Sequence, residues 1–123
     1  MQTLRARQVS WSNPVAAGLR AALRAETTPR QGAQSAVDDD GADIAVFLII
    51  YEVATGQPVG CGGLRRHADG HTDAAYIYVV PYARWSGVSA VIVEELACWA
   101  RVHGITVGWA DAAALDEAVS FRL

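Results

Sequence analysis

The segment Tyr78–Ala90 reads YVVPYARWSGVSA, and along it the residue pattern changes from that of a strand to that of a helix. Before Pro81, apolar and β-branched residues follow one another as in a buried strand. Beyond the loop, apolar residues recur at helical spacing, and Gly104 follows as a helix-ending residue. The segment therefore predicts a strand over 72–80 and a helix over 87–103.

The loop between these two elements has the composition of an anion site. Backbone N–H groups at a helix start are unpaired, and the helix dipole adds partial positive charge, which suits a pyrophosphate. Gly87, Ser89 and Ala90 are small enough to let a phosphate approach the backbone, and Arg84 can add a formal charge at the rim. Glycine also occurs in such turns for packing alone, so the residues by themselves leave both interpretations open.

Two further strands precede this junction. Residues 43–53 are almost continuously apolar, which predicts a strand buried on both faces. The turn formers of 55–58 lead back into a second strand over 59–66, which contains three glycines. Asp69-Gly70 makes the next turn into the strand over 72–80. These three strands predict an antiparallel meander.

The ends of the chain complete a single domain over 1–123. A first strand is expected over 3–11, and a helix capped by Asn13 over 14–26. Residues 27–42 are expected to form a flexible connection, and after the helix over 87–103 we expect a strand over 105–109 and a helix from 115. The order β-α-β-β-β-α-β-α indicates an α+β sandwich with a mixed sheet.

Composition excludes several classes of protein. The chain has 123 residues, 52% of them hydrophobic, and a net charge of −3 with no lysine, which argues against a nucleic-acid partner. Its longest apolar run, 44–51, is far too short to cross a membrane, and no leader is apparent, so a cytoplasmic protein is expected.

Cysteine and histidine spacing gives no metal motif. Cys61 and Cys98 stand alone and are expected to be reduced, largely buried thiols. His67 and His71 flank a turn without an evident third ligand, so we expect no metal there, and His103 suits a helix C-terminus.

The same segments resemble the GNAT superfamily of N-acyltransferases. The acyl-CoA loop of that family has the pattern Q/R-x-x-G-x-G/A, and here the loop reads Arg84-x-x-Gly87-x-Ser89. Residues 60–65 resemble the family's third strand and 96–104 its third helix. Glu117-Ala118-Val119 resembles the start of the fourth helix, so the resemblance covers nearly the whole chain in order.

The resemblance implies an acetyltransferase that uses acetyl-CoA as co-substrate and no metal. An amine of a small molecule or peptide would attack the thioester directly, and an N–H near Val79 or Val80 would stabilise the oxyanion. Asp73 lies eleven residues before Arg84, where some members carry a glutamate base, although an exposed aspartate beside a turn is the alternative. The residues expected to bind the cofactor are Tyr78, Val79, Val80, Arg84, Trp85, Ser86, Gly87, Val88, Ser89 and Ala90.

The chain also departs from the family pattern. Ser89 replaces the last Gly/Ala of the loop, and Trp85 and Ser86 stand where a further glycine and arginine are usual. Arg122 aligns with the tyrosine that protonates the thiolate in many members. The last two strands of the family are expected to be missing, which would leave an open sheet edge and favour a homodimer. The alternative function is therefore a catalytically inactive CoA-binding or dimerisation module.

Overall fold

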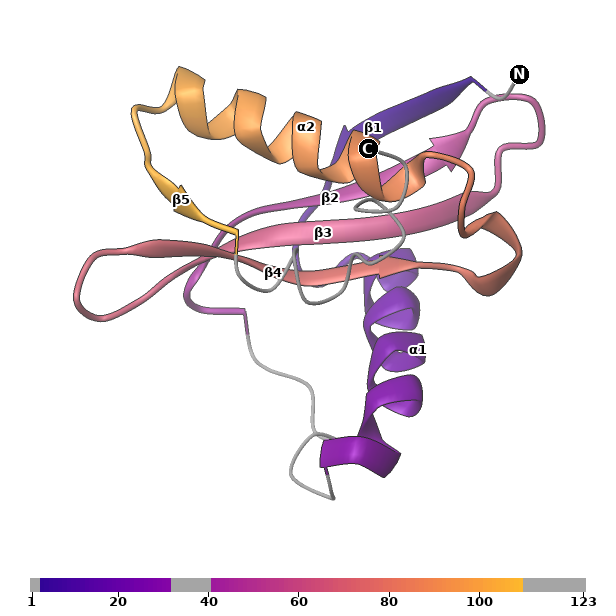
Figure 1. The fold of residues 1–123 in the computed structure, drawn as a ribbon, viewed down its shortest axis with the longest axis horizontal. Coiled ribbons are helices and arrows are strands. Elements are labelled where there is room, and N and C mark those ends of the chain that lie inside the picture. The colour runs from indigo at the N-terminus through magenta and orange to yellow at the C-terminus, as the bar shows by residue number, and fades with distance from the viewer. Residues whose placement is uncertain (1–2, 32–40, 110–123) are drawn as a thin grey trace.

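The structure is a computed structural model that describes residues 3–31 and 41–109. Its elements follow the predicted order (Figure 1). They are β1 (Leu4–Gln8), α1 (Pro14–Gln31), β2 (Ile44–Glu52), β3 (Pro58–Arg66), β4 (Thr72–Val79), the short 3-10 helix η2 (Pro81–Ala83), α2 (Val88–Val102) and β5 (Val107–Gly108). The helix expected from 115 lies outside the described residues.

The strands form one mixed sheet in the order β1-β2-β3-β4-β5. The first three pairings are antiparallel, and β5 lies parallel to β4. Helix α2 lies along one face of this sheet, and α1 stands against the other (Figure 1). The predicted α+β sandwich with a mostly antiparallel sheet is therefore confirmed.

The apolar run in β2 is buried on both faces, as predicted. Val46, Leu48 and Ile50 belong to the core beneath α2. Phe47 and Ile49 belong to a second core on the face covered by α1. Because side chains alternate along a strand, one continuous apolar run supplies both layers.

The glycines of β3 let α2 lie close to the sheet. A Cβ added to Gly62 would stand 2.5 Å from Cγ2 of Ile92, and one added to Gly60 would stand 2.8 Å from Cγ1 of Val88. Both distances are shorter than side chains tolerate, so the space above β3 is filled by α2 itself. The close packing of α2 on β3 therefore fixes the distance between the start of α2 and the sheet.

Helix α1 begins as predicted but ends later. The Asn13 side chain caps it, accepting hydrogen bonds from the N–H groups of Val15 (2.9 Å) and Ala16 (3.2 Å). The helix then continues to Gln31, so the prediction of a flexible connection from residue 27 is wrong over 27–31.

Neither helix in the described ranges is both long and apolar enough to cross a bilayer.

Candidate functional site

A β-bulge interrupts β4 midway. Cys61 pairs with Tyr78 but Gly63 pairs with Ala75, so β4 carries one more residue than β3 between these pairs. Tyr76 takes up the difference with a φ of 59°, a left-handed conformation that is uncommon for a residue other than glycine. The Tyr76 side chain is held by a hydrogen bond from the Arg65 guanidinium to its hydroxyl group and by an edge contact with Trp11. The sequence contains no signal for this bulge, because its left-handed residue is a tyrosine.

Beyond the bulge, two β4 amides point away from β3. The N–H of Val80 donates to the carbonyl of Val59 at 3.0 Å, so Val80 is engaged with β3 and is excluded as an oxyanion donor. Strand alternation then turns the N–H of Val79 to the opposite side. The carbonyl of Tyr76 accepts from Sγ of Cys61 at 3.4 Å, and across a trans peptide the next N–H, that of Ile77, points away from Cys61. Ile77 was not among the predicted site residues.

The side of β4 to which these amides point carries little strand pairing in the described part of the chain. Strand β5 pairs with β4 only at Thr72↔Val107 and Asp73↔Gly108. From Ala74 onward no described strand accompanies β4 on that side. The result is a parallel pair that is joined at its start and unpaired toward the end of β4, where α2 begins.

The loop after β4 presents further amides at the helix start. Gly87 has a φ of 94° and directly precedes α2, and exposed Trp85 is also left-handed with a φ of 70°. Among described atoms, no acceptor is found for the N–H groups of Ser86, Gly87, Val88 and Ala90. The N–H of Arg84, in contrast, donates to the carbonyl of Pro81 at 3.3 Å within the 3-10 turn. The possible anion cradle therefore begins after Arg84.

The Arg84 side chain forms hydrogen bonds within the protein. Its Nε donates to the carbonyl of Val79 at 2.8 Å, and its Nη2 lies 2.9 and 2.7 Å from the two carboxylate oxygens of Glu26. The hydroxyl of Tyr78 donates to the same carboxylate at 2.8 Å. The expected formal charge at the loop rim is thus neutralised by Glu26, a residue of α1 that sequence spacing gave no reason to select.

Burial and the Glu26 carboxylate together change the ionisation of Tyr78. Removal from water, followed by the hydrogen bond to Glu26, raises the pKa of Tyr78 to about 12. The phenol is consequently neutral at physiological pH and acts as a hydrogen-bond donor. Tyr78 faces the α1 core, so its predicted contact with a cofactor would come from its backbone.

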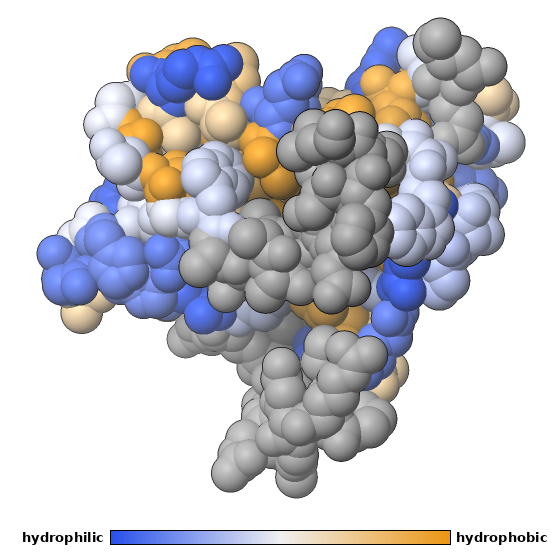
Figure 2. All heavy atoms as spheres, viewed as in Figure 1, coloured by the Kyte–Doolittle hydropathy of each residue, from blue (hydrophilic) through white to orange (hydrophobic). Residues whose placement is uncertain are grey.

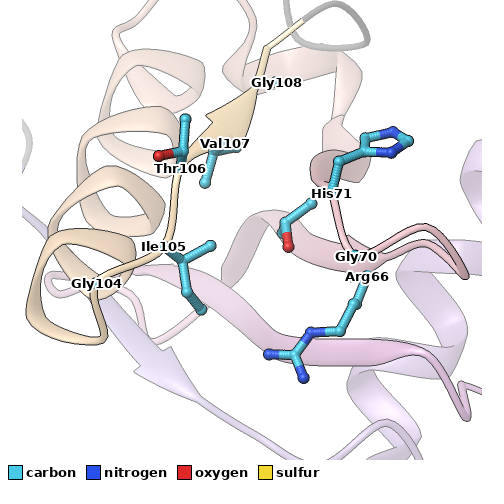
Figure 3. Close-up of a pocket in the computed structure, with 9 residues that line it drawn as sticks. Arg66, Gly70, His71, Gly104, Ile105, Thr106, Val107 and Gly108 are labelled. Carbon is cyan, nitrogen blue, oxygen red and sulfur yellow. The ribbon is translucent and has the colours of Figure 1, made fainter.

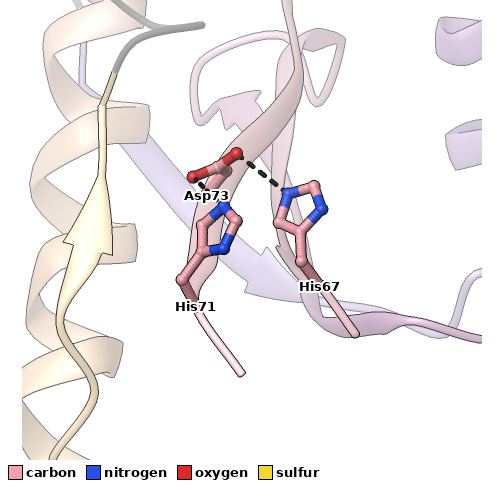
Figure 4. A group of neighbouring side chains, drawn as sticks. All are labelled: His67, His71 and Asp73. Atoms are coloured by element: carbon pink, nitrogen blue, oxygen red, sulfur yellow. Dashed lines mark hydrogen bonds and ion pairs between the residues drawn. The ribbon is translucent and has the colours of Figure 1, made fainter. Parts of the chain in front are cut away.

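Asp73, the predicted base, lies between two histidines at the start of β4 (Figure 4). Its Oδ2 is 2.9 Å from Nε2 of His67, and its Oδ1 is 3.5 Å from Nε2 of His71. The expectation that His67 and His71 lack a third potential ligand is therefore wrong, because Asp73 joins them from the next strand. Hairpin pairing brings together residues that the linear spacing keeps apart.

A cavity of about 660 Å³ opens near the same end of β4 (Figure 3). It lies between the β3–β4 hairpin and the connection from α2 to β5, with Arg66, Thr72 and Ile105 in its lining. The loop over 84–90 contributes nothing to it. The cavity and the candidate anion cradle are thus at opposite ends of β4.

The two cysteines differ in environment. Cys61 is fully buried, and burial raises the pKa of its thiol to about 12. Cys98 is exposed on α2, so the prediction of two largely buried thiols holds for Cys61 and is wrong for Cys98. His103 caps the end of α2 as predicted, with Nδ1 2.8 Å from the carbonyl of Trp99.

A mixed, mostly antiparallel five-stranded sheet with α1 on one face and α2 on the other is a GNAT-like α+β fold. The described part of this chain has that fold, and comparison with solved structures supports the assignment. A provisionally named acyl-CoA N-acyltransferase from Klebsiella pneumoniae superposes with a TM-score of 0.70 at 20% identity, covering 99% of this chain and 81% of that one.

Two further acetyltransferases are similar in structure. An aminoglycoside 6'-N-acetyltransferase from Acinetobacter baumannii gives a TM-score of 0.55 at 19% identity, covering 98% of this chain and 86% of that one. A glucosamine-6-phosphate N-acetyltransferase from Arabidopsis thaliana gives 0.52 at 16% identity, covering 87% and 81%. No family model and no curated protein matches the sequence.

Proposed function

We propose that this protein is an N-acetyltransferase that moves the acetyl group of acetyl-CoA to a primary amine of a small molecule or peptide by direct attack. The observation that carries the proposal is that two groups of hydrogen-bond donors, both backbone amides, follow one another along the chain. Amides of β4 point to its unpaired side, and the unpaired amides at the start of α2 follow directly in the chain. One set suits the acyl and pantetheine part of the cofactor, and the other suits its diphosphate.

The diphosphate would lie on the N–H groups of Ser86, Gly87, Val88 and Ala90, with Ser89 completing the turn. Gly87 has a left-handed φ of 94°, a conformation that occurs in anion-binding backbone nests. Trp85 is 61% exposed beside them and offers an aromatic surface to the adenine. Because Arg84 is paired with Glu26, the charge for the phosphates comes mainly from the backbone and the helix dipole.

The oxyanion of the tetrahedral intermediate would accept a hydrogen bond from the N–H of Ile77 or Val79. Both amides are held in place by β4 itself, so they need no reorganisation as charge develops on the oxygen. The bulge at Tyr76 supports this role, because it turns the strand just before the first of them. Tyr78 and Val80, which alternate with these residues, contribute the strand backbone and its pairing with β3.

Asp73 remains our candidate base, and its position constrains where the reaction occurs. Val79 lies six positions beyond Asp73 along the strand, which corresponds to about 20 Å. An amine served by Asp73, directly or through water, would therefore attack a carbonyl bound nearer Ile77 than Val79. A neutral amine is required, since a protonated amine has no lone pair with which to attack.

The alternative is a GNAT-like module that binds CoA or dimerises without catalysis. The neutralised charge of Arg84 favours it, because turnover gains from phosphate contacts that hold the thioester in place. Pairing through β5 would produce the homodimer, since β5 is the last strand of the sheet within the described residues. Cys61 and Cys98, both free thiols, suit the reducing cytoplasm in which we place either function.

The test combines binding with turnover. Thermal unfolding is measured with and without acetyl-CoA, and CoA thiol release is followed over an amine panel that includes aminosugars, after the names of the similar enzymes. At 100 times its dissociation constant the cofactor should stabilise the fold by about 2.7 kcal/mol. Stabilisation with amine-dependent thiol release supports the enzyme, and stabilisation without release leaves only the module. No stabilisation at millimolar acetyl-CoA contradicts both.

A further inference from the structure

We propose that His67, His71 and Asp73 form a binding site for a divalent transition-metal ion, with Zn²⁺ as the ion that suits the donor set best. The three side chains lie together on the β3–β4 hairpin, on strand ends far from the loop over 84–90 (Figure 4). The proposal goes beyond acetyl transfer but shares Asp73 with it, because an ion bound here would occupy the carboxylate that we propose as the base.

The spacing of the donor atoms fits a single ion. One ring nitrogen of His67, one ring nitrogen of His71 and a carboxylate oxygen of Asp73 all lie within 4.8 Å of one another. Ligands held tetrahedrally at about 2.0–2.2 Å from zinc are separated from each other by about 3.3 Å. Each nitrogen lies near that distance from a different carboxylate oxygen, with Nε2 of His67 2.9 Å from Oδ2 of Asp73 and Nε2 of His71 3.5 Å from Oδ1.

The hairpin explains why the three residues meet. The N–H of His67 donates to the carbonyl of His71 at 2.8 Å, so the two histidines face each other across the hairpin. Asp73 lies two residues beyond His71 and therefore projects from the same face of the strand. Gly70, with a φ of 94°, closes the turn between them. The site rests on backbone pairing rather than on a free loop.

Neighbouring residues orient the His71 ring and leave space around the Asp73 carboxylate. Oδ1 of Asp69 lies 2.5 Å from Nδ1 of His71, the arrangement in which a carboxylate holds the proton on one ring nitrogen and leaves Nε2 to the metal. Beside Asp73, a Cβ at position 108 would stand 2.7 Å from its Oδ1, so Gly108 leaves the carboxylate room to turn. The His67 and His71 rings are stacked at 4.2 Å, and the His71 ring must tilt to bring both nitrogens onto one ion. Its side chain is 54% exposed, which permits that tilt.

The donor set determines the class of ion. Two imidazoles and one carboxylate suit Zn²⁺, Co²⁺ and Ni²⁺, whereas Mg²⁺ and Ca²⁺ prefer oxygen ligands throughout. The hairpin surface is hydrophilic (Figure 2), and the three side chains are partly exposed, at 34% for His67, 54% for His71 and 31% for Asp73, so an ion can enter and keep water at its remaining position.

The experiment is a titration of the untagged full chain with Co²⁺, followed by its optical spectrum, and displacement of the Co²⁺ by Zn²⁺. The variants His67→Gln and His71→Gln each remove one ligand. His103→Gln is the matched control for loss of a histidine, and Cys98→Ser tests the exposed thiol as a competing ligand. Asp69→Asn leaves all three ligands in place and removes the partner of His71.

The proposal predicts one Co²⁺ bound per chain, with visible bands displaced by Zn²⁺ and without a sulfur charge-transfer band. His67→Gln and His71→Gln should each lose this binding, and Asp69→Asn should weaken it by about 10–100-fold. His103→Gln and Cys98→Ser should bind like the parent chain. Circular dichroism verifies that each variant folds. If a ligand variant fails to fold, Asp69→Asn still tests the site, because it keeps all three ligands. Absence of stoichiometric binding, or binding that survives loss of both ligand histidines, overturns the proposal.

Discussion

Arg84 and Glu26 join the loop before α2 to helix α1 through both oxygens of one carboxylate, at 2.9 and 2.7 Å. The two residues are 58 positions apart, and their contact decides how much charge the loop can offer an anion. Both side chains are more than a third exposed, at 36% and 41%, so the pair is screened by water.

The first prediction follows from releasing Arg84. Glu26→Gln leaves the guanidinium with its charge uncompensated beside the loop, so acetyl-CoA should bind more tightly. The gain should be about two- to fivefold, the equivalent of about 0.5–1 kcal/mol for a partly exposed charge. Isothermal titration calorimetry of Glu26→Gln measures it, with Arg84→Ala/Glu26→Gln as the control in which the gain disappears. An unchanged or weaker affinity in Glu26→Gln would show that the pair does not regulate the charge of the loop.

The second prediction concerns two glycines in opposite surroundings. Gly62→Ala places a methyl group 2.5 Å from Ile92 and should lower the free energy of unfolding by about 1–3 kcal/mol through overpacking. Gly18→Ala lies within α1 with nothing within 4 Å and should raise it by about 0.5–1 kcal/mol. Urea denaturation of both variants measures the contrast. Equal effects at the two positions would mean that α2 does not lie directly on β3.

The third prediction is a pH dependence. The pKa of Tyr78 is raised to about 12 in the fold, above its ordinary value of 10.0, so the neutral phenol is the form that the fold stabilises. Its contribution to stability is complete below pH 10 and is lost as the pH rises toward 12. The stability difference between the parent chain and Tyr78→Phe should therefore shrink between about pH 10 and about pH 12. A difference that stays constant over that interval would mean that Tyr78 titrates normally.

The fourth prediction concerns thiol reactivity. Cys98 is exposed, whereas burial raises the pKa of the Cys61 thiol to about 12 and leaves it protonated and inaccessible. Ellman's reagent at neutral pH should therefore titrate one thiol in the folded protein and two after unfolding. In Cys98→Ser the folded protein should release no thionitrobenzoate. Rapid reaction of two thiols in the folded parent chain would place Cys61 on the surface.

The sequence predicted the layered fold because its strongest patterns coincide with its deepest burial. The apolar run of β2, the Asn13 cap and the helical spacing after Gly87 each report a local preference that the packed structure preserves. The extension of α1 to Gln31 was missed, because threonine and proline are poor helix formers on their own.

The site was less predictable because its key contacts are not local. The bulge at Tyr76 is stabilised by Arg65 and Trp11, and the charge of Arg84 is cancelled by Glu26, pairings that no spacing along the chain reveals. The proximity of Asp73 to His67 and His71 could have been found by laying the hairpin out from Gly70. The position of Asp73 relative to Arg84 concerns a single strand and therefore says nothing of its neighbours across the hairpin.

The central claim is that amides at the end of β4 and the start of α2 hold acetyl-CoA, and amide chemical-shift mapping tests it most directly. On addition of acetyl-CoA to ¹⁵N-labelled protein, the account predicts the largest shifts at Ser86, Gly87, Val88 and Ala90, accompanied by Ile77 and Val79. Shifts confined to the cavity near Arg66 and Ile105, or no shifts at saturating cofactor, would contradict it.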